Sequence, residues 1–225
     1  MRILLLVALL AAIACQPSTV AAKPSAVTGV PAGWHAVTNR TNIAVGELSK
    51  TVATGFRIAL PQDWDELEVD REAVVARYRE WAADNPTAAA SMSETTYVNG
   101  VVTSTKLLAA PTDTSGNGPV EFHIFALWVD AAVTLDRFIG DTTRSYKWTM
   151  GATLRSGSRM KIGEREAYVL RMQVPPTAPG KVMTVTAYLL TRDREIWMLE
   201  FVGPLDRMDR LEPIFDEIAS TFRLL

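Results

Sequence analysis

Side chains that could act as nucleophiles or general bases are few in this chain of 225 residues. There is one cysteine, Cys15, and there are two histidines, His35 and His123. Hydrolysis by a serine or cysteine nucleophile needs a base beside the nucleophile, and no G-x-S-x-G turn occurs, since RSGSR at 155–159 has the wrong order. His123 lies in EFHIFALW, an alternating stretch in which Phe122 and Ile124 mark the core face. We therefore expect His123 to be a half-covered strand residue, and a hydrolase is not indicated.

Carboxylates gather in DWDELEVDRE at 63–72 and, more sparsely, in LDRMDR at 205–210, which we interpret as a polar turn. A calcium loop needs a glycine for its sharp turn, and the stretch at 63–72 has none. Acidic residues also favour the N-terminus of a helix, so we interpret the stretch as a solvated loop in which Asp70 caps the next helix. The cysteine and histidine counts are too low for a zinc cluster, and no glycine-rich phosphate loop is present. We expect no metal and no cofactor.

The single cysteine follows a short apolar segment. The run at 3–14 is uncharged and shorter than the roughly 20 residues that span a bilayer, which is typical of the core of a secretion signal. Ala12-Ile13-Ala14 before Cys15 resembles the lipobox of bacterial lipoproteins, with Ala12 where leucine is usual. In that motif the cysteine takes up diacylglycerol and signal peptidase cuts before it. We predict a signal peptide at 1–14 and lipidation of Cys15; the alternative is a plain signal peptide followed by an incidental cysteine.

The predicted lipid anchor at Cys15 indicates where the protein is located and that the membrane is one of its partners. Two acyl chains, such as palmitate, hold a protein stably on a membrane, so we expect an extracytoplasmic lipoprotein on the outer face of the cell membrane, or in the outer membrane of a two-membrane envelope. The 23 basic and 25 acidic side chains give a net charge of −2. Because no basic face is clustered, we expect no nucleic-acid partner.

Residues 15–50 are predicted to carry the lipid and form a linker or arm. The segment 16–33 is rich in Ala, Pro, Ser, Thr and Gly and cannot bury enough apolar surface to order itself. The pattern at 34–50 fits either a tether or an arm packed on the domain, and both remain open. Apolar periodicity then continues to the last residue, so we predict a single globular domain at 51–225.

The spacing of apolar residues in this domain indicates both helices and strands. We predict helices at 71–84, at 134–148 and from 212 onward, and strands at 55–61, 101–110, 120–129, 152–158, 165–174, 181–190 and 195–203. The final helix is expected to begin near Glu212 because Pro213 is unfavourable inside a helix. A polar turn at 191–195 predicts a hairpin. Strands in series with helices outside them indicate an α+β fold, an antiparallel sheet flanked by helices.

Three landmarks in the domain together resemble the PsbP-like superfamily. They are ALPQDW at 59–64, Ile162-Gly163 leading to Ala167-Tyr168, and PIFDEIASTFR at 213–223. The resemblance is closest to the actinobacterial lipoprotein branch of LpqN-like proteins. It implies an α/β/α sandwich over 51–225 and a binding or assembly role, and it supplies no catalytic motif.

The sequence is consistent with two functions. The first is a non-catalytic envelope lipoprotein domain that binds an envelope protein or an amphiphilic ligand. The second is an envelope enzyme that uses carboxylates and hydroxyls, which needs two close carboxylates in different environments. Among the tryptophans, we assign Trp81, Trp128 and Trp197 to the core and take Trp148 as the candidate for a binding surface.

Overall fold

The computed structural model describes residues 30–45, 50–84, 86–90, 93–113, 120–129, 131–175 and 182–225. The elements follow in the order β1 (Trp34–Val45), β2 (Lys50–Pro61), β3 (Trp64–Leu67), α1 (Arg71–Asp84), α2 (Pro86–Ala89), α3 (Glu94–Ser104), β4 (Thr105–Pro111), β5 (Glu121–Trp128), α4 (Leu135–Met150), β6 (Thr153–Ile162), β7 (Arg165–Val174), β8 (Met183–Arg192), β9 (Glu195–Pro204), α5 (Leu205–Thr221) and β10 (Arg223–Leu224).

The strands form two antiparallel sheets. A seven-stranded sheet has the order β3-β4-β5-β9-β8-β7-β6, and a three-stranded sheet has the order β1-β2-β10. The predicted hairpin is present, because β8 and β9 pair along their whole length and close at Arg192 opposite Glu195. The predicted α+β fold with antiparallel strands flanked by helices is confirmed.

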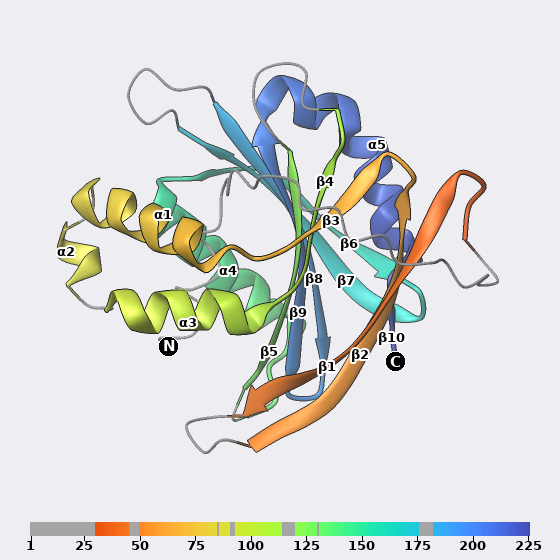
Figure 1. Ribbon diagram of the computed structural model, residues 1–225, viewed down its shortest axis with the longest axis horizontal. Helices are drawn as coiled ribbons and strands as arrows, with labels where there is room; N and C mark the ends of the chain where they lie inside the picture. The colour runs from red at the N-terminus through yellow and green to blue at the C-terminus, as the bar shows by residue number, and fades with distance from the viewer. Residues whose placement is uncertain are drawn as a thin grey trace.

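Both faces of the large sheet are covered (Figure 1). Helices α1, α3 and α4 pack on one face, where they share a buried apolar cluster with β5, β7, β8 and β9. Helix α5 and the strand β2 of the small sheet pack on the other face with a second cluster. Successive side chains of a central strand point to opposite faces of the sheet. Because both faces are buried, these side chains enter one or the other apolar cluster, and neither set faces solvent.

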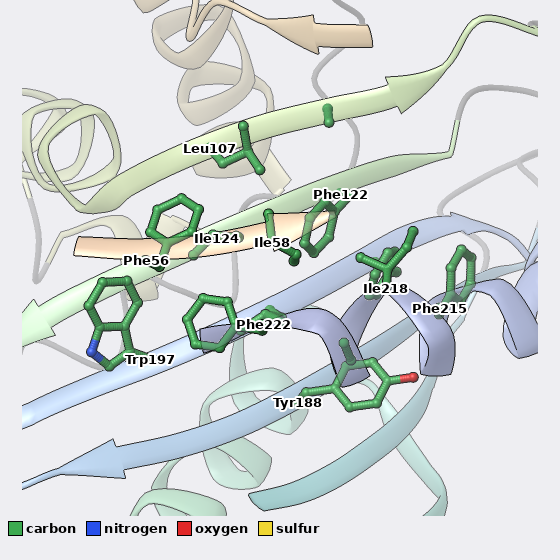
Figure 2. Packing of buried hydrophobic residues seen from close by; sticks show 14 of the residues in the cluster. Phe56, Ile58, Leu107, Phe122, Ile124, Tyr188, Trp197, Phe215, Ile218 and Phe222 are labelled. Carbon is green, nitrogen blue, oxygen red and sulfur yellow. The ribbon is translucent and has the colours of Figure 1, made fainter. Parts of the chain in front are cut away.

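The landmarks at 59–64 and 213–223 meet in one aromatic core on the α5 face. Trp64 packs edge-on against Phe122, Phe201 and Phe215, with ring centroids 6.2–6.5 Å apart. Phe201 stacks between Phe122 at 4.3 Å and Phe215 at 4.2 Å. Figure 2 shows side chains of this cluster from β2, β5 and α5 pointing toward one another. The aromatic side chains of these two landmarks therefore pack in the hydrophobic core.

The folded unit begins before Thr51. Strand β1 pairs with β2 along its whole length, from Trp34 opposite Pro61 to Val45 opposite Lys50. Val37 and Ile43 are buried in the cluster on the α5 face. The stretch 34–45, which the sequence left ambiguous, is therefore a packed strand.

Helix α3 replaces the first part of a predicted strand. The prediction placed a strand at 101–110, whereas Val101–Ser104 end a helix that begins at Glu94 and only β4 is extended. The Ser93 side chain caps this helix by accepting from the Thr96 N–H. Tyr97, Val98 and Val101 are buried at helical spacing. Packing against the other helices and the sheet therefore overrides the strand preference of the β-branched residues.

The last helix begins a full two turns earlier than predicted. Helix α5 starts at Leu205 and contains Pro213. Pro213 is exposed, and the first turn is held by burial of Met208 and by Arg207, which donates to the Asp113 carbonyl oxygen at 2.8 Å. These contacts offset the single backbone hydrogen bond that the proline cannot make.

Gly55 provides a test of the pairing between β1 and β2. A Cβ at this position would lie 2.7 Å from the Asn39 carbonyl oxygen, which is backbone and cannot rotate away. We expect Gly55→Ala to lower the free energy of unfolding by about 1–3 kcal/mol, the usual cost of overpacking, measured by urea denaturation.

Gly140 is the matched control. It is exposed in α4, and a Cβ there would meet nothing within 4 Å. Gly140→Ala is expected to raise stability by about 0.5–1 kcal/mol because alanine favours a helix interior. Equal effects of the two substitutions would contradict the close approach at Gly55.

Candidate binding site

A cavity of about 360 Å³ lies between α5 and the outer strands of the large sheet. We call it the α5 groove. Its lining comes from β6, β7, β8 and α5: Arg155, Ser156, Arg171, Thr184, Thr186, Met208, Asp209 and Glu212. The volume is in the range of sites that hold small ligands or the end of a peptide segment.

Ion pairs link the sheet to α5 along this groove. Arg155 Nη1 lies 3.0 Å from Asp209 Oδ1, and both side chains are about half exposed. Arg171 pairs with Glu212 and, through Nη2 at 3.4 Å, with Asp216. Exposed pairs of this kind contribute little to stability because water competes for both charges. A bound molecule can therefore replace the Arg155–Asp209 pair at small cost.

Tyr188 fixes the inner side of this network. Its hydroxyl donates to Asp216 Oδ1 at 2.5 Å. Burial raises the pKa of the Tyr188 phenol, and the hydrogen bond to Asp216 adds to the shift. The phenol is therefore a constant donor that orients Asp216 toward Arg171.

The floor of the groove is polar although it is buried. Thr184 and Thr186 are each 3% exposed and stand on the α5 face of β8. The Thr184 hydroxyl has no hydrogen-bond partner among the residues that the structure describes. Buried polar atoms are nearly always paired, so this oxygen is free to contact a bound molecule.

A second polar group lies on the other face of the sheet, beneath α4. We call it the Glu200 cluster: Glu121, His123, Tyr146 and Glu200, each at most 2% exposed. His123 Nε2 lies 3.3 Å from Glu121 Oε2, and the Tyr146 hydroxyl donates to Glu200 Oε1. His123 and Glu200 are direct cross-strand neighbours. The prediction of a half-covered His123 is wrong, because helices cover this face as well.

Burial dominates the electrostatics of this cluster. It raises the pKa of Glu200 to about 7; His123 and the Tyr146 hydroxyl lower it, and the Glu121 carboxylate raises it further. Burial also raises the pKa of Tyr146, and the charge of Glu200 adds to that shift. The cluster thus holds a carboxyl that exchanges its proton near neutral pH but is closed to solvent.

The candidates named from the sequence are not brought together. Cys15 lies outside the described residues. Trp148 is 53% exposed near the end of α4, on the sheet face opposite the α5 groove. Trp197 is fully buried as predicted and Trp128 is partly buried against the same core, whereas the side chain of Trp81 is not among those described.

The acidic stretch was predicted to be a solvated loop, but part of it is a strand: Trp64–Leu67 form β3, which pairs with β4. The predicted helix cap at Asp70 is present. Asp70 Oδ1 accepts from the backbone N–H of Glu72 at 2.8 Å and of Ala73 at 3.3 Å. Across the described ranges no group of three or more His, Cys, Asp or Glu side chains is arranged to hold a metal. Within the same ranges no helix has the length and apolar character needed to cross a membrane.

The groove residues were missed by sequence reasoning. A signal exists in MTVTAYLL, where Thr184 and Thr186 alternate with apolar residues on a strand of otherwise apolar character. By itself, that stretch predicts only a strand at 181–190. The distant partners Arg155, Arg171 and Glu212 have no spacing that would connect them before the fold is known.

Comparison with known proteins gives a likeness of fold. No known family profile and no curated protein sequence matches the chain. The solution structure of cyanobacterial PsbP (CyanoP) from Synechocystis sp. PCC 6803 superposes with a TM-score of 0.51 at 12% identity, over 89% of this chain and 98% of that chain. The fold is PsbP-like.

Two further structures are similar to this chain. LpqN of Mycobacterium tuberculosis, described as involved in cell envelope biogenesis, has a TM-score of 0.47 at 12% identity over 83% of this chain and 91% of that chain. The putative regulator PA94 of Pseudomonas aeruginosa has a TM-score of 0.43 at 14% identity over 48% of this chain and 76% of that chain.

Proposed function

We propose that this chain is a lipid-anchored accessory domain of the bacterial cell envelope that binds its target without catalysis through the α5 groove. The observation that carries the proposal is the open cavity beneath α5, with the exposed Arg155–Asp209 ion pair at its mouth and a Thr184 hydroxyl in its floor that has no partner among the described residues. A PsbP-like fold supplies no shared catalytic motif, which agrees with a binding role.

The lining of the groove favours a polar target. Met208 is the apolar side chain of the lining, and the others are charged or carry hydroxyls. An acyl chain gains by burial against apolar surface, which this lining does not offer. The groove therefore suits a polypeptide segment of an envelope protein, or the polar end of an amphiphilic molecule, better than a lipid tail.

The anchor is tested by mass spectrometry of the protein extracted from membranes. We expect a mature chain that begins at Cys15 and carries the mass of its acyl chains, and we expect Cys15→Ala to leave the membrane fraction. An unmodified Cys15 in the extracted protein would contradict the anchored half of the proposal.

Binding is tested by affinity capture from detergent-solubilised membranes. Asp209→Lys reverses one charge at the mouth of the groove and is expected to reduce recovery of a stoichiometric partner at least tenfold. Asp136→Lys is the matched control, because Asp136 on α4 is also an exposed aspartate that pairs with an arginine of β6, Arg159, and α4 covers the sheet face opposite the groove. Equal recovery with both variants would place the binding surface elsewhere.

The enzyme alternative rests on a separate observation. Glu121 and Glu200 are two buried carboxylates near His123, and the pKa of Glu200 is raised to about 7, as in many general acids. The cluster is closed, so a substrate would have to enter by displacement of α4. Turnover of an envelope ester or glycan that is lost in Glu200→Gln would favour this alternative; binding to the groove without turnover favours the accessory domain.

A further inference from the structure

The large sheet carries a group of ionisable side chains in its interior beneath α4, on the face opposite the α5 groove. Glu200 on β9 lies directly across from His123 on β5, and Glu121 lies two residues away on the same face. All three side chains are at most 2% exposed. Buried charges are costly unless they are fully paired, so the protonation of this group affects how tightly α4 packs.

Pairing across the contact between α4 and the sheet is incomplete. Tyr146 on α4 donates its hydroxyl proton to Glu200 Oε1. Glu200 Oε2 and His123 Nδ1 on the sheet, and Thr142 Oγ1 one turn before Tyr146 on α4, have no hydrogen-bond partner in the part of the chain that is described. Polar atoms on both sides of the contact between α4 and the sheet therefore lack hydrogen-bond partners. Among them, Glu200 Oε2 is the carboxyl oxygen that can be protonated.

We propose that Glu200 is a proton-dependent latch for α4: with a proton on its carboxyl, α4 is closed on the sheet, and release of that proton to water loosens the helix. Ionised Glu200 would place a second carboxylate beside Glu121 in a buried layer. The His123 imidazole is the one group there that could balance the two charges among the side chains named above. Entry of water between α4 and β9 relieves that cost, because water can solvate Glu200 Oε2.

The direction of the pH dependence follows from the environment of Glu200. Burial raises its pKa to about 7, against roughly 4.3 for an exposed glutamate. The closed state therefore binds the proton more tightly than the open state. The closed contact is most stable below about pH 4.3, weakens as the pH rises toward 7, and changes no further above that value.

Other titratable groups of this layer are few and have partners of their own. His123 and Glu121 come from β5 and Tyr146 from α4. The neighbouring helices contribute the phenols of Tyr78 and Tyr97, whose ring centroids lie 5.1 Å apart. Strand β4 contributes the half-buried Lys106, whose ammonium donates to the Thr103 carbonyl oxygen at 2.6 Å.

Hydrogen exchange of the α4 amides tests the latch. After correction for the intrinsic exchange rate, the opening constant of α4 in the unmodified sequence is expected to rise about tenfold per pH unit between pH 5 and 7 and then level off. In Glu200→Gln it should not depend on pH, and the amides of α5 should show no such step in either protein. The same rise in both proteins, or an equal rise in α5, would overturn the proposal.

A second measurement keeps the test decisive if Glu200→Gln does not fold. Carboxyl carbon-13 titration of the unmodified sequence should reveal one glutamate with a midpoint near pH 7, and His123→Gln should move that midpoint to higher pH, because the imidazole lowers the pKa of Glu200. Glu195→Gln is the matched control: Glu195 is a buried glutamate of the same strand that is paired with Arg192, and its loss should leave the midpoint in place. Absence of any glutamate that titrates above pH 6 would contradict the latch.

Discussion

Phe201→Ala is expected to lower the free energy of unfolding by about 4 kcal/mol, close to the upper range for loss of a buried aromatic side chain. Phe201 has no exposed surface and its ring stacks between those of Phe122 and Phe215. The side chain joins β9 to β5 and to α5, so the cavity left by alanine cannot be closed by one neighbour alone. Equilibrium urea denaturation followed by tryptophan fluorescence measures the loss.

Phe201→Leu is the control for volume. Leucine keeps most of the apolar contact and loses the ring stacking, so we expect a loss of roughly 1–2 kcal/mol. If Phe201→Ala costs no more than Phe201→Leu, the aromatic stack is not the centre of this core.

Arg192→Ala is expected to lower stability by about 3 kcal/mol because it leaves a buried carboxylate unpaired. Glu195 is nearly buried, and its Oε2 accepts from Arg192 Nε at 2.8 Å and from Trp197 Nε1 at 3.0 Å. Arg192 also donates to the Thr54 hydroxyl at 2.7 Å and to the Leu225 carbonyl oxygen at 3.0 Å. One guanidinium thus connects the β8–β9 hairpin to β2 and to the residue after β10.

The double variant Arg192→Met with Glu195→Gln separates the charge from the packing. Removing both charges leaves no buried carboxylate without a partner, so we expect thermal and urea denaturation to show a loss at least 1 kcal/mol smaller than that of Arg192→Ala. A double variant as unstable as the single one would show that the ion pair is not the source of the effect.

Short-range patterns were sufficient for most elements and for the fold class. The β8–β9 hairpin, helix α4 and strand β5 follow from alternation, helical spacing and turn residues within one segment. The landmark at 59–64 was informative because Trp64 meets Phe201 and Phe215 in one core. Patterns of this kind reflect packing, which constrains residue type at each position.

Long-range packing explains the differences. The strand preference of Val101 and Val102 is overridden because their segment packs as a helix. Pro213 is accepted within α5 because Met208, five residues earlier, is buried and holds the start of the helix. His123 was expected at a half-exposed face because a single sequence does not state that α1, α3 and α4 cover that face.

The groove lies beyond sequence reasoning for the same reason. Arg155 and Asp209 are 54 residues apart, and Arg171 and Asp216 are 45 residues apart. No local spacing connects either pair, and each residue alone is typical of a solvated surface. Only the placement of α5 over β6, β7 and β8 brings Arg155, Arg171 and Asp209 into the lining of one cavity.

The proposed binding of a target in the α5 groove can be observed in place by site-specific photo-crosslinking in intact membranes. A photoreactive amino acid would replace Asp209 at the groove or, as the reference, Asp136 on α4. We predict a single discrete crosslinked product from position 209 and none from position 136. Equal products from both positions, or a product from position 136 alone, would contradict binding in the groove.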